Sequence, residues 1–266
     1  MPRDIRCDRW ATACGSLNVE LMDISPAGSS PLLVLWDVDG TLINNGGVSK
    51  EAYAGGFTAL TGRVLEHPVI TDGQTDPAIM RSLLVRHGIE PTPELLAQVD
   101  DVMPAALEAL VPRLRERGHA QPGAREAIAA LARQAGVVQS VLTGNIAPNG
   151  YTKLAAFGLH ASLDFEVGGY GSDSEVRADL VNAARRKATS KYGVPFDPVS
   201  TVLIGDTPRD VEAGRVGGAY VIAVATGEYD AEQLLAEGAD IALSDLRDTD
   251  LVVRTVLAAR LRRSVA

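Results

Sequence analysis

Short apolar runs alternate with segments of helical periodicity along most of the chain. Runs typical of strands buried on both faces of a sheet lie at residues 32–36, 136–145, 200–207 and 219–227, with weaker candidates at 163–169 and 239–245. Helical patterns lie between them at 123–136, 174–193, 206–218 and 230–239. Strands that alternate with helices predict an α/β fold, a doubly wound parallel sheet covered by helices on both faces.

The segment between the first and second predicted strands is too long for one crossover helix. It holds no convincing strand, and helical patterns fill it at residues 49–62, 76–89 and 93–117. We therefore expect an inserted α-helical cap at 49–118, carried by a core that comprises 31–48 and 119–266. Residues 1–30 have mixed polarity without a clear period, and we expect them to form an N-terminal extension.

Composition and charge narrow the classes of partner. Hydrophobic residues make up 46% of the 266 residues, enough for a sizeable core, and the formal net charge is −9. This acidic balance argues against nucleic acid as the main partner, although a local site can still bind an anionic small molecule. No apolar run approaches the ~20 residues of a membrane span, and the N-terminus lacks the apolar segment of a signal peptide.

Cysteine usage bears on the compartment. The two cysteines, Cys7 and Cys14, have no second Cys or His pair nearby, which disfavours a zinc site. Two free thiols indicate a reducing environment, so we expect a cytoplasmic protein that does not bind membranes. We expect it to be a monomer or a weak homodimer.

Polar residues follow three of the predicted strands at the point where each strand ends. They are Asp37 and Asp39 after the first strand, Thr143, Gly144 and Asn145 after the second, and Asp206 and Asp210 after the strand at 201–205. Because ligands in an open parallel sheet bind off the carboxyl ends of the strands, we expect these residues to converge. Carboxylates that close repel one another unless a cation lies among them, and ligation by oxygen alone suits a hard ion such as Mg²⁺.

The order of these motifs resembles that of the haloacid dehalogenase superfamily. The motifs are D-V-D-G-T at 37–41, T-G-N at 143–145, a downstream Lys, and G-D-x-x-x-D at 205–210. Within the superfamily, the chain resembles the phosphoglycolate-phosphatase-like phosphatases that carry a helical cap after the first strand. The likeness covers about residues 31–245 and is specific for the superfamily but weak for the substrate. We expect the strand order 3-2-1-4-5.

The resemblance implies roles for the four aspartates. Asp37 is the nucleophile that forms an aspartyl-phosphate, and Asp39 protonates the leaving group and then activates water. Mg²⁺ is held by Asp37, by the backbone carbonyl of Asp39 and by Asp206, with support from Asp210 behind the metal shell or through a water. Asp39 has to be protonated while Asp37 is ionised, so their surroundings must push the two pKa values apart.

The same resemblance assigns phosphate binding to Thr143, Gly144 and Asn145. A cation must also lie beside Asp37 and the phosphate, because one Mg²⁺ cannot neutralise a phosphate dianion and several carboxylates. Lys153 is preferred for this position, on a helix that starts near Tyr151 so that Lys153 lies in its first turn. Arg177, at the start of the next helix, is the alternative.

We expect a phosphoric monoester hydrolase, an Mg²⁺-dependent phosphatase for a small metabolite such as phosphoglycolate or a sugar phosphate. Candidate specificity residues on the cap are Gln74, Thr75 and Asp76. A phosphohexose mutase of the same superfamily stays open, although the linker at 43–50 lacks the His expected in that group. The chain length and the insert disfavour a receiver-type signalling domain, and the presence of Asp39 disfavours a metal-free dehalogenase.

Overall fold

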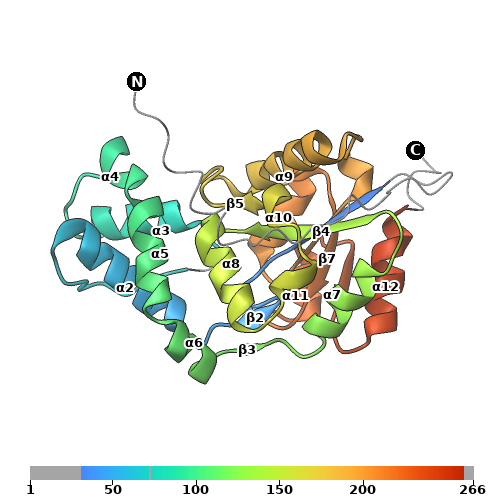
Figure 1. The fold of residues 1–266 in the computed structure, drawn as a ribbon, viewed down its shortest axis with the longest axis horizontal. Helices are drawn as coiled ribbons and strands as arrows, with labels where there is room; N and C mark the ends of the chain where they lie inside the picture. The colour runs from blue at the N-terminus through green and yellow to red at the C-terminus, as the bar shows by residue number, and fades with distance from the viewer. Residues whose placement is uncertain (1–30, 72, 261–266) are drawn as a thin grey trace.

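Within residues 31–71 and 73–260, which the computed structural model describes, six parallel strands form the central sheet in the order β5-β4-β1-β6-β7-β8 (Figure 1). The strands are β1 (Leu32–Trp36), β4 (Val137–Thr143), β5 (Gly169–Tyr170), β6 (Thr201–Gly205), β7 (Tyr220–Val224) and β8 (Ile241–Leu243). Counted without the separate pair β2 and β3, the order along the chain is 3-2-1-4-5-6. The expected order is confirmed, and β8 extends the sheet by one strand.

The apolar run of β1 is continuous because both of its faces are buried. Leu32, Val34 and Trp36 belong to an apolar cluster with residues of α7 (Ala124–Ala132) and α12 (Thr249–Ala258). Leu33 and Leu35 belong to a second cluster, with residues of α9 (Arg177–Tyr192) and α10 (Pro208–Gly217). Figure 1 shows α9 and α10 on one side of the sheet and α7 and α12 on the other. The doubly wound arrangement is therefore confirmed.

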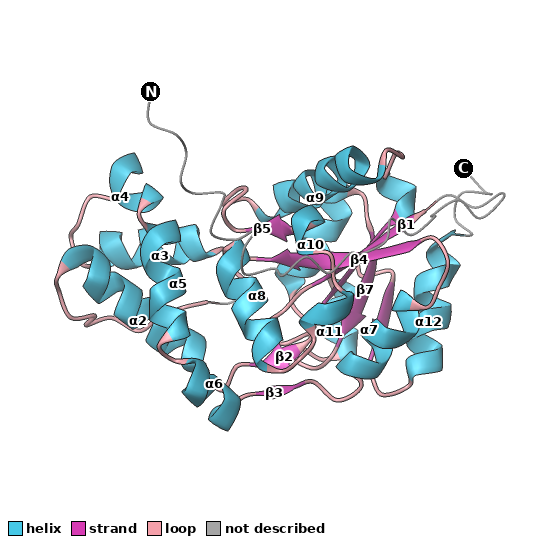
Figure 2. Ribbon diagram, in the orientation of Figure 1, coloured by secondary structure: helices cyan, strands magenta, loops and turns pink. Residues whose placement is uncertain are grey.

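Five helices form a separate group beside the sheet (Figure 2). They are α2 (Val48–Thr61), α3 (Asp76–Arg86), α4 (Pro93–Ala97), α5 (Val99–Glu108) and α6 (Val111–Arg117). Residues of α2, α3, α4 and α5 form an apolar cluster of their own, to which Ile146 of the core also contributes. We refer to the five helices as the cap helices. Apart from Val48 at the start of α2, they fall within the segment expected to form the cap, and the exact division of the chain into core and cap stays a prediction.

Both connections between the cap helices and the sheet pass through a two-stranded neck. Its strands β2 (Ile43–Asn44) and β3 (His119–Ala120) are antiparallel, with Ile43 opposite Ala120 and Asn44 opposite His119. Directly after β3, the backbone N–H of Gln121 donates to the carbonyl of Leu42 at 2.8 Å. The neck thus brings the outgoing and returning chain together close to the end of β1. Two-residue strands leave no periodicity in the sequence, and neither strand was predicted.

The single helix predicted at 93–117 is wrong, because α4, α5 and α6 divide this segment. Pro112 accompanies the second break and lies in the first turn of α6, where a proline costs no intrahelical hydrogen bond. The same rule explains a wrong boundary in the core. Helix α8 (Ala147–Ala156) begins at Ala147 and not near Tyr151, with Pro148 in its first turn.

The candidate strand at 163–169 is wrong over most of its length. Phe165–Val167 form a 3₁₀ helix, which begins where the Asp164 side chain accepts a hydrogen bond from the N–H of Glu166. Such local side-chain bonds compete with strand pairing. Only β5, at the edge of the sheet, is extended and pairs with β4. Helix α12 was not predicted.

The described residues bear on two further expectations from the sequence. Among them, no helix combines the length and the apolar composition needed to cross a membrane. The predicted extension at 1–30, with Cys7 and Cys14, lies outside the described part of the chain, so the predictions made for it stay open.

Candidate active site

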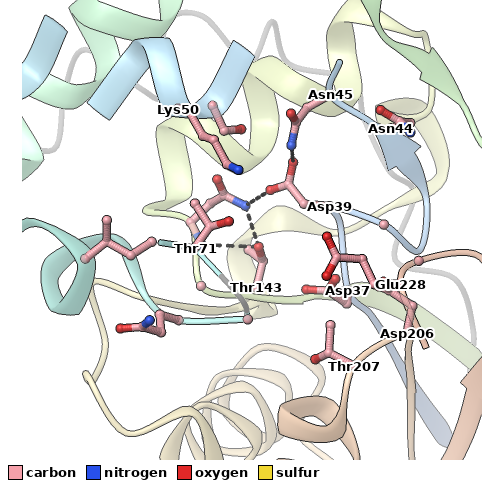
Figure 3. Close-up of a pocket in the computed structure, with 18 of the residues that line it drawn as sticks. Asp37, Asp39, Asn44, Asn45, Lys50, Thr71, Thr143, Asp206, Thr207 and Glu228 are labelled. Carbon is pink, nitrogen blue, oxygen red and sulfur yellow. Dashed lines mark hydrogen bonds between the residues drawn. The ribbon is translucent and has the colours of Figure 1, made fainter. Parts of the chain in front are cut away.

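The carboxyl ends of the strands face a cavity of about 710 Å³ that is also lined by the neck and the cap helices (Figure 3). This volume is typical of small-molecule sites. Six of the seven predicted strand-end residues line it, namely Asp37, Asp39, Thr143, Gly144, Asn145 and Asp206. The seventh, Asp210, is buried behind the lining. The predicted convergence at one edge of the sheet therefore occurs.

Three aspartates form a buried cluster at the floor of the cavity. Asp37, Asp206 and Asp210 each place a carboxylate oxygen within 4.8 Å of the others. Burial raises the pKa of Asp37 well above its usual range, and Asp210 beside it adds to the rise. Burial and Asp210 likewise raise the pKa of Asp206 to about 7. The cluster thus carries more negative charge than its surroundings compensate.

The donor set of this cluster fits a hard divalent cation such as Mg²⁺, because it consists of carboxylate oxygens alone. A bound cation would favour the ionised forms of Asp37 and Asp206. Thr41 orients Asp206 by donating from Oγ1 to Oδ1 at 2.6 Å. At Gly40, φ is +97° and a Cβ would lie 2.2 Å from Asp206 Oδ2, so only glycine fits there. The side chain of Asp39 is not part of the cluster.

Arg177, the first residue of α9, is the cation in contact with the cluster. Its Nη2 lies 2.5 Å from Asp37 Oδ1 and 2.5 Å from Asp210 Oδ1, and its Nε lies 3.0 Å from the same oxygen of Asp210. The other oxygen of Asp210 accepts from Thr207 Oγ1 at 2.7 Å. Both oxygens of Asp210 are therefore engaged within the protein, which suits a supporting residue more than a direct ligand.

Asp39 lies apart from the cluster and contacts Lys153 instead. Lys153 Nζ is 2.6 Å from Asp39 Oδ2, and Asn145 Nδ2 is 2.8 Å from the same oxygen. Asn45 donates to Asp39 Oδ1 at 2.7 Å, as Figure 3 shows. Lys153 also donates to Asn145 Oδ1 at 2.6 Å, and its side chain is 3% exposed. Lys153 thus reaches the site, but it contacts Asp39 and not Asp37.

The two aspartates of D-V-D-G-T differ in pKa, as expected, but in the opposite direction. Burial alone would raise the pKa of Asp39, yet the charge of Lys153 and hydrogen bonds from Asn145 and Asn45 outweigh it and lower the pKa. The pKa of Asp37 is the one that is raised. The surroundings therefore favour the ionised form of Asp39 and the protonated form of Asp37, and a cation bound beside Asp37 would shift it toward the ionised form.

Thr143, the last residue of β4, offers a donor to the cavity. Its Oγ1 accepts from the backbone N–H of Asn145 at 3.2 Å and from Asn145 Nδ2 at 2.7 Å. Because both of these partners donate, the hydroxyl proton of Thr143 is free to be donated to an anionic oxygen. The N–H of Asn145 is already bonded in this arrangement, so the hydroxyl is the clearer of the predicted phosphate-binding groups.

Residues 73–76, which we call the cap loop, include the three predicted specificity residues. Two of these three reach the cavity. Gln74 and Asp76 line it, whereas Thr75 is buried outside the lining. Arg177 Nη1 donates to the carbonyl of Gly73 at 3.2 Å. The side chain that contacts Asp37 therefore also contacts the cap loop.

Several residues that line the cavity were not predicted from the sequence. They come from the neck, from α2 and from the loop after β7, and include Asn44, Asn45, Lys50, Tyr53, Gln121, Thr226 and Glu228. The loop after β7 had a usable signal, because a predicted parallel strand ends there. Lys50 and Tyr53 had none, since only the position of α2 over the sheet places them at the site. Figure 3 shows Lys50 pointing into the cavity.

Solved structures share the fold at low sequence identity. A putative β-phosphoglucomutase from Bacteroides vulgatus is 21% identical, and the match covers 86% of this chain and 90% of that one with a TM-score of 0.62. CbbY from Rhodobacter sphaeroides in complex with phosphate is 19% identical over 82% of this chain and 96% of that one, with a TM-score of 0.61. A predicted phosphoglycolate phosphatase from Haemophilus somnus 129pt is 16% identical over 86% and 100%, with a TM-score of 0.56.

The sequence itself carries the family assignment. No protein of curated function matches the chain. The pattern of the haloacid dehalogenase-like hydrolases matches residues 34–215, a segment that holds all three strand-end motifs and the cap helices. This match confirms the expected resemblance: the chain belongs to the haloacid dehalogenase-like hydrolases.

Proposed function

We propose that this hydrolase is an Mg²⁺-dependent phosphatase that cleaves a small phosphate monoester through an aspartyl-phosphate on Asp37. The observation that carries the proposal is the position of Asp37, which lines the cavity, belongs to the carboxylate cluster and contacts Arg177. Thr143 lines the same cavity with a free donor. Positioning and charge neutralisation are what phosphoryl transfer requires, and this arrangement provides groups for both.

Residues for the metal follow from the cluster. Asp37 and Asp206 would hold Mg²⁺ together with the backbone carbonyl of Asp39, and Asp210 would support them. Bound there, Mg²⁺ would neutralise the carboxylates and part of the phosphate charge. Arg177 supplies the other positive charge beside Asp37, so we assign to it the cation position for which the sequence favoured Lys153.

In the first step, an oxygen of Asp37 forms a bond to phosphorus while the bond from phosphorus to the leaving oxygen breaks. The Thr143 hydroxyl and the guanidinium of Arg177 hold the phosphate oxygens. Asp39 gives its proton to the leaving alkoxide, so it has to enter this step protonated. The cap helices exclude water from the site while the aspartyl-phosphate forms.

In the second step, water attacks phosphorus and Asp39 takes a proton from it, which regenerates Asp37 and releases phosphate. The contacts of Asp39 suit this step, because Lys153, Asn145 and Asn45 hold its carboxylate ionised. Lys153 therefore acts on Asp39 and not on the nucleophile.

The substrate is proposed to be a small metabolite, with phosphoglycolate and sugar phosphates as candidates. The cavity leaves room beyond a phosphoryl group, and Gln74 of the cap loop is among the residues that line it. One solved structure of this fold is titled a predicted phosphoglycolate phosphatase. A cytoplasmic location and a monomeric or weakly dimeric state remain proposals made from the sequence.

A phosphate-release screen over a panel of metabolites, with Mg²⁺ and with chelator, tests the function. The wild-type protein should release phosphate from an aryl phosphate and from at least one metabolite with Mg²⁺, and from none in chelator. No phosphate release from any monoester in the presence of Mg²⁺ would overturn the proposal. Full activity after exhaustive dialysis against chelator would contradict the metal dependence.

A phosphohexose mutase is the second candidate, because two solved structures with this fold carry β-phosphoglucomutase titles. Against it, residues 43–50 contain no His, and the neck residue in contact with Asp39 is Asn45. Conversion of a hexose 1-phosphate to its 6-phosphate without net phosphate release would favour the mutase.

A further inference from the structure

The cap loop rests directly on the loop that follows β4. The backbone N–H of Asp76 donates to the carbonyl of Gly144 at 2.7 Å, and the N–H of Ile146 donates to Asp76 Oδ2 at 2.9 Å. A Cβ on Gly144 would lie 2.1 Å from the carbonyl oxygen of Gln74, so the two loops touch backbone to backbone. Asp76 therefore joins the cap to the core through its main chain and its side chain.

The Asp76 carboxylate is engaged on both of its oxygens. Oδ2 accepts from Ile146, and Oδ1 accepts from the hydroxyl of Tyr53 of α2 at 2.5 Å. Asp76 is 1% exposed, although it contributes to the lining of the cavity. A carboxylate held from both sides by protein donors is a link between elements more than a contact for substrate.

The loop that Asp76 holds carries groups that the reaction needs. Thr143 presents its hydroxyl to the cavity, and Asn145 contacts both Asp39 and Lys153. Ile146 follows directly and is buried in the apolar cluster of the cap helices. A shift of residues 143–146 would therefore displace Thr143, Asn145 and, through Asn145, the carboxylate of Asp39.

We propose that Asp76 is a positioning residue that aligns residues 143–146 when the cap lies on the core, so that Thr143 and Asp39 take their reactive positions only in the enclosed site. This inference rests on the proposed phosphatase function. Alignment by the cap would couple enclosure of the substrate to assembly of the site, as closure does in other enzymes with lids.

The burial of the Asp76 carboxylate is unfavourable for folding, which supports a functional reason for its presence. Burial raises the pKa of Asp76 to about 6, against the opposing effects of Lys153 and of the bonds from Tyr53 and Ile146. Burial also raises the pKa of Tyr53, so the phenol stays a donor. A buried carboxylate is a poor stabiliser compared with an apolar residue, so what Asp76 contributes is its hydrogen-bonding geometry.

Two variants, an isosteric amide and a longer carboxylate, separate alignment from charge. In Asp76→Asn, the amide oxygen can accept from Ile146 and the amide NH₂ can donate to the Tyr53 oxygen, so the link is kept without charge. In Asp76→Glu, the charge is kept but an added methylene moves the carboxylate out of register. Arg81→Gln is the matched control, because Arg81 of α3 joins the cap to Glu175 of the core at 2.6 Å through an exposed ion pair.

The first measurement is steady-state hydrolysis of an aryl phosphate with Mg²⁺, with circular dichroism to confirm that each variant is folded. We expect Asp76→Glu to lower kcat by about 10-fold or more with little change in KM, because alignment acts on the reacting groups. Asp76→Asn should stay within about 3-fold of wild type, and Arg81→Gln within about 2-fold. An Asp76→Asn enzyme as impaired as Asp76→Glu, or an Asp76→Glu enzyme with wild-type kcat, would overturn the inference.

The second measurement does not depend on activity. Hydrogen exchange of the peptide that contains Ile146 should be faster in Asp76→Glu than in wild type, and unchanged in Asp76→Asn and Arg81→Gln. Unchanged exchange in Asp76→Glu would overturn the inference. A wild-type protein that hydrolyses none of the phosphate esters would instead overturn the proposed function. The hydrogen-exchange result would still decide whether Asp76 holds residues 143–146.

Discussion

The Nη2 nitrogen of Arg177 donates to Asp37 Oδ1 and to Asp210 Oδ1, each at 2.5 Å. The guanidinium thus joins the proposed nucleophile to the aspartate proposed to support the metal site. Since Lys153 is bonded to Asp39 and Asn145, the two cations serve different carboxylates. This division gives each of them a distinct expected effect on catalysis.

Arg177→Ala should lower kcat/KM on an aryl phosphate by on the order of 10² or more, because the charge beside Asp37 is lost in the transition state. Arg177→Lys should recover part of the loss. Lys153→Ala should also cost activity, but its main effect should fall on the steps that use Asp39. Steady-state kinetics of the three variants check this. If Arg177→Ala keeps the wild-type kcat/KM while Lys153→Ala loses most of it, Lys153 and not Arg177 supplies the charge that acts on Asp37.

Asp39→Asn should separate substrates by their leaving groups. An alkyl phosphate needs a proton on its leaving oxygen, whereas an aryl oxide needs little protonation. We therefore expect the variant to lose activity on an alkyl phosphate by a larger factor than on an aryl phosphate, and to form some phosphoenzyme with the aryl ester. Rapid-quench kinetics with both esters measure the two factors. Equal factors would contradict the acid role of Asp39.

Strand ends were predictable because they depend on local sequence. The end of the apolar run of β1 locates Asp37 and Asp39. Parallel pairing of the strands then brings the residues at their carboxyl ends to the same edge of the sheet. The choice between Lys153 and Arg177 was not predictable, since it depends on where α8 and α9 begin and on how they lie over the sheet. Pro148 precedes the helix start predicted near Tyr151, yet it fits the first turn of α8.

Contacts between cap and core were beyond the reach of the sequence for a different reason. Asp76 was a candidate for substrate contact, but its bonds to Tyr53 and Ile146 join segments far apart in the chain. Asn45 reaches Asp39 across the turn in which the N–H groups of Leu42 and Ile43 both donate to the carbonyl of Val38. No periodicity or spacing encodes such pairs in a single sequence.

Asp206→Asn should weaken the binding of Mg²⁺, because it removes one charge from the carboxylate cluster. In the wild-type protein, Mg²⁺ should raise Tm in a concentration-dependent way, since a ligand of the folded state stabilises it. The variant should need at least about 10-fold more Mg²⁺ for the same rise in Tm. Thermal unfolding across a Mg²⁺ titration tests this, with Asp245→Asn as a control outside the site. The same titration curve in all three proteins would contradict the assigned metal site.

Asp76→Asn should be more stable than wild type at neutral pH. The pKa of Asp76 is about 6 in the folded protein and about 3.9 for an unperturbed Asp. The folded state therefore holds this proton more tightly, and the stability gained from it is complete below about pH 4 and lost as the pH rises through about 6. Because the variant cannot ionise, its advantage should be about 3 kcal/mol at pH 7.5 and should shrink toward pH 4.5.

Urea unfolding of the two proteins at pH 4.5 and pH 7.5 checks this pH dependence. The difference in the free energy of unfolding should grow with pH. A difference that is independent of pH would show that the pKa of Asp76 is not raised in the folded protein.

Trapping of the phosphoenzyme tests the proposed mechanism most directly. Wild type and Asp37→Asn are mixed with a labelled aryl phosphate and Mg²⁺ and quenched in acid, and covalently bound phosphate is counted and located by peptide mapping. Wild type should carry label on the peptide that contains Asp37, and Asp37→Asn should carry none and show no turnover, because the amide cannot serve as the nucleophile. Equal incorporation into both proteins, or label on a different peptide, would contradict the assignment of Asp37 as the nucleophile.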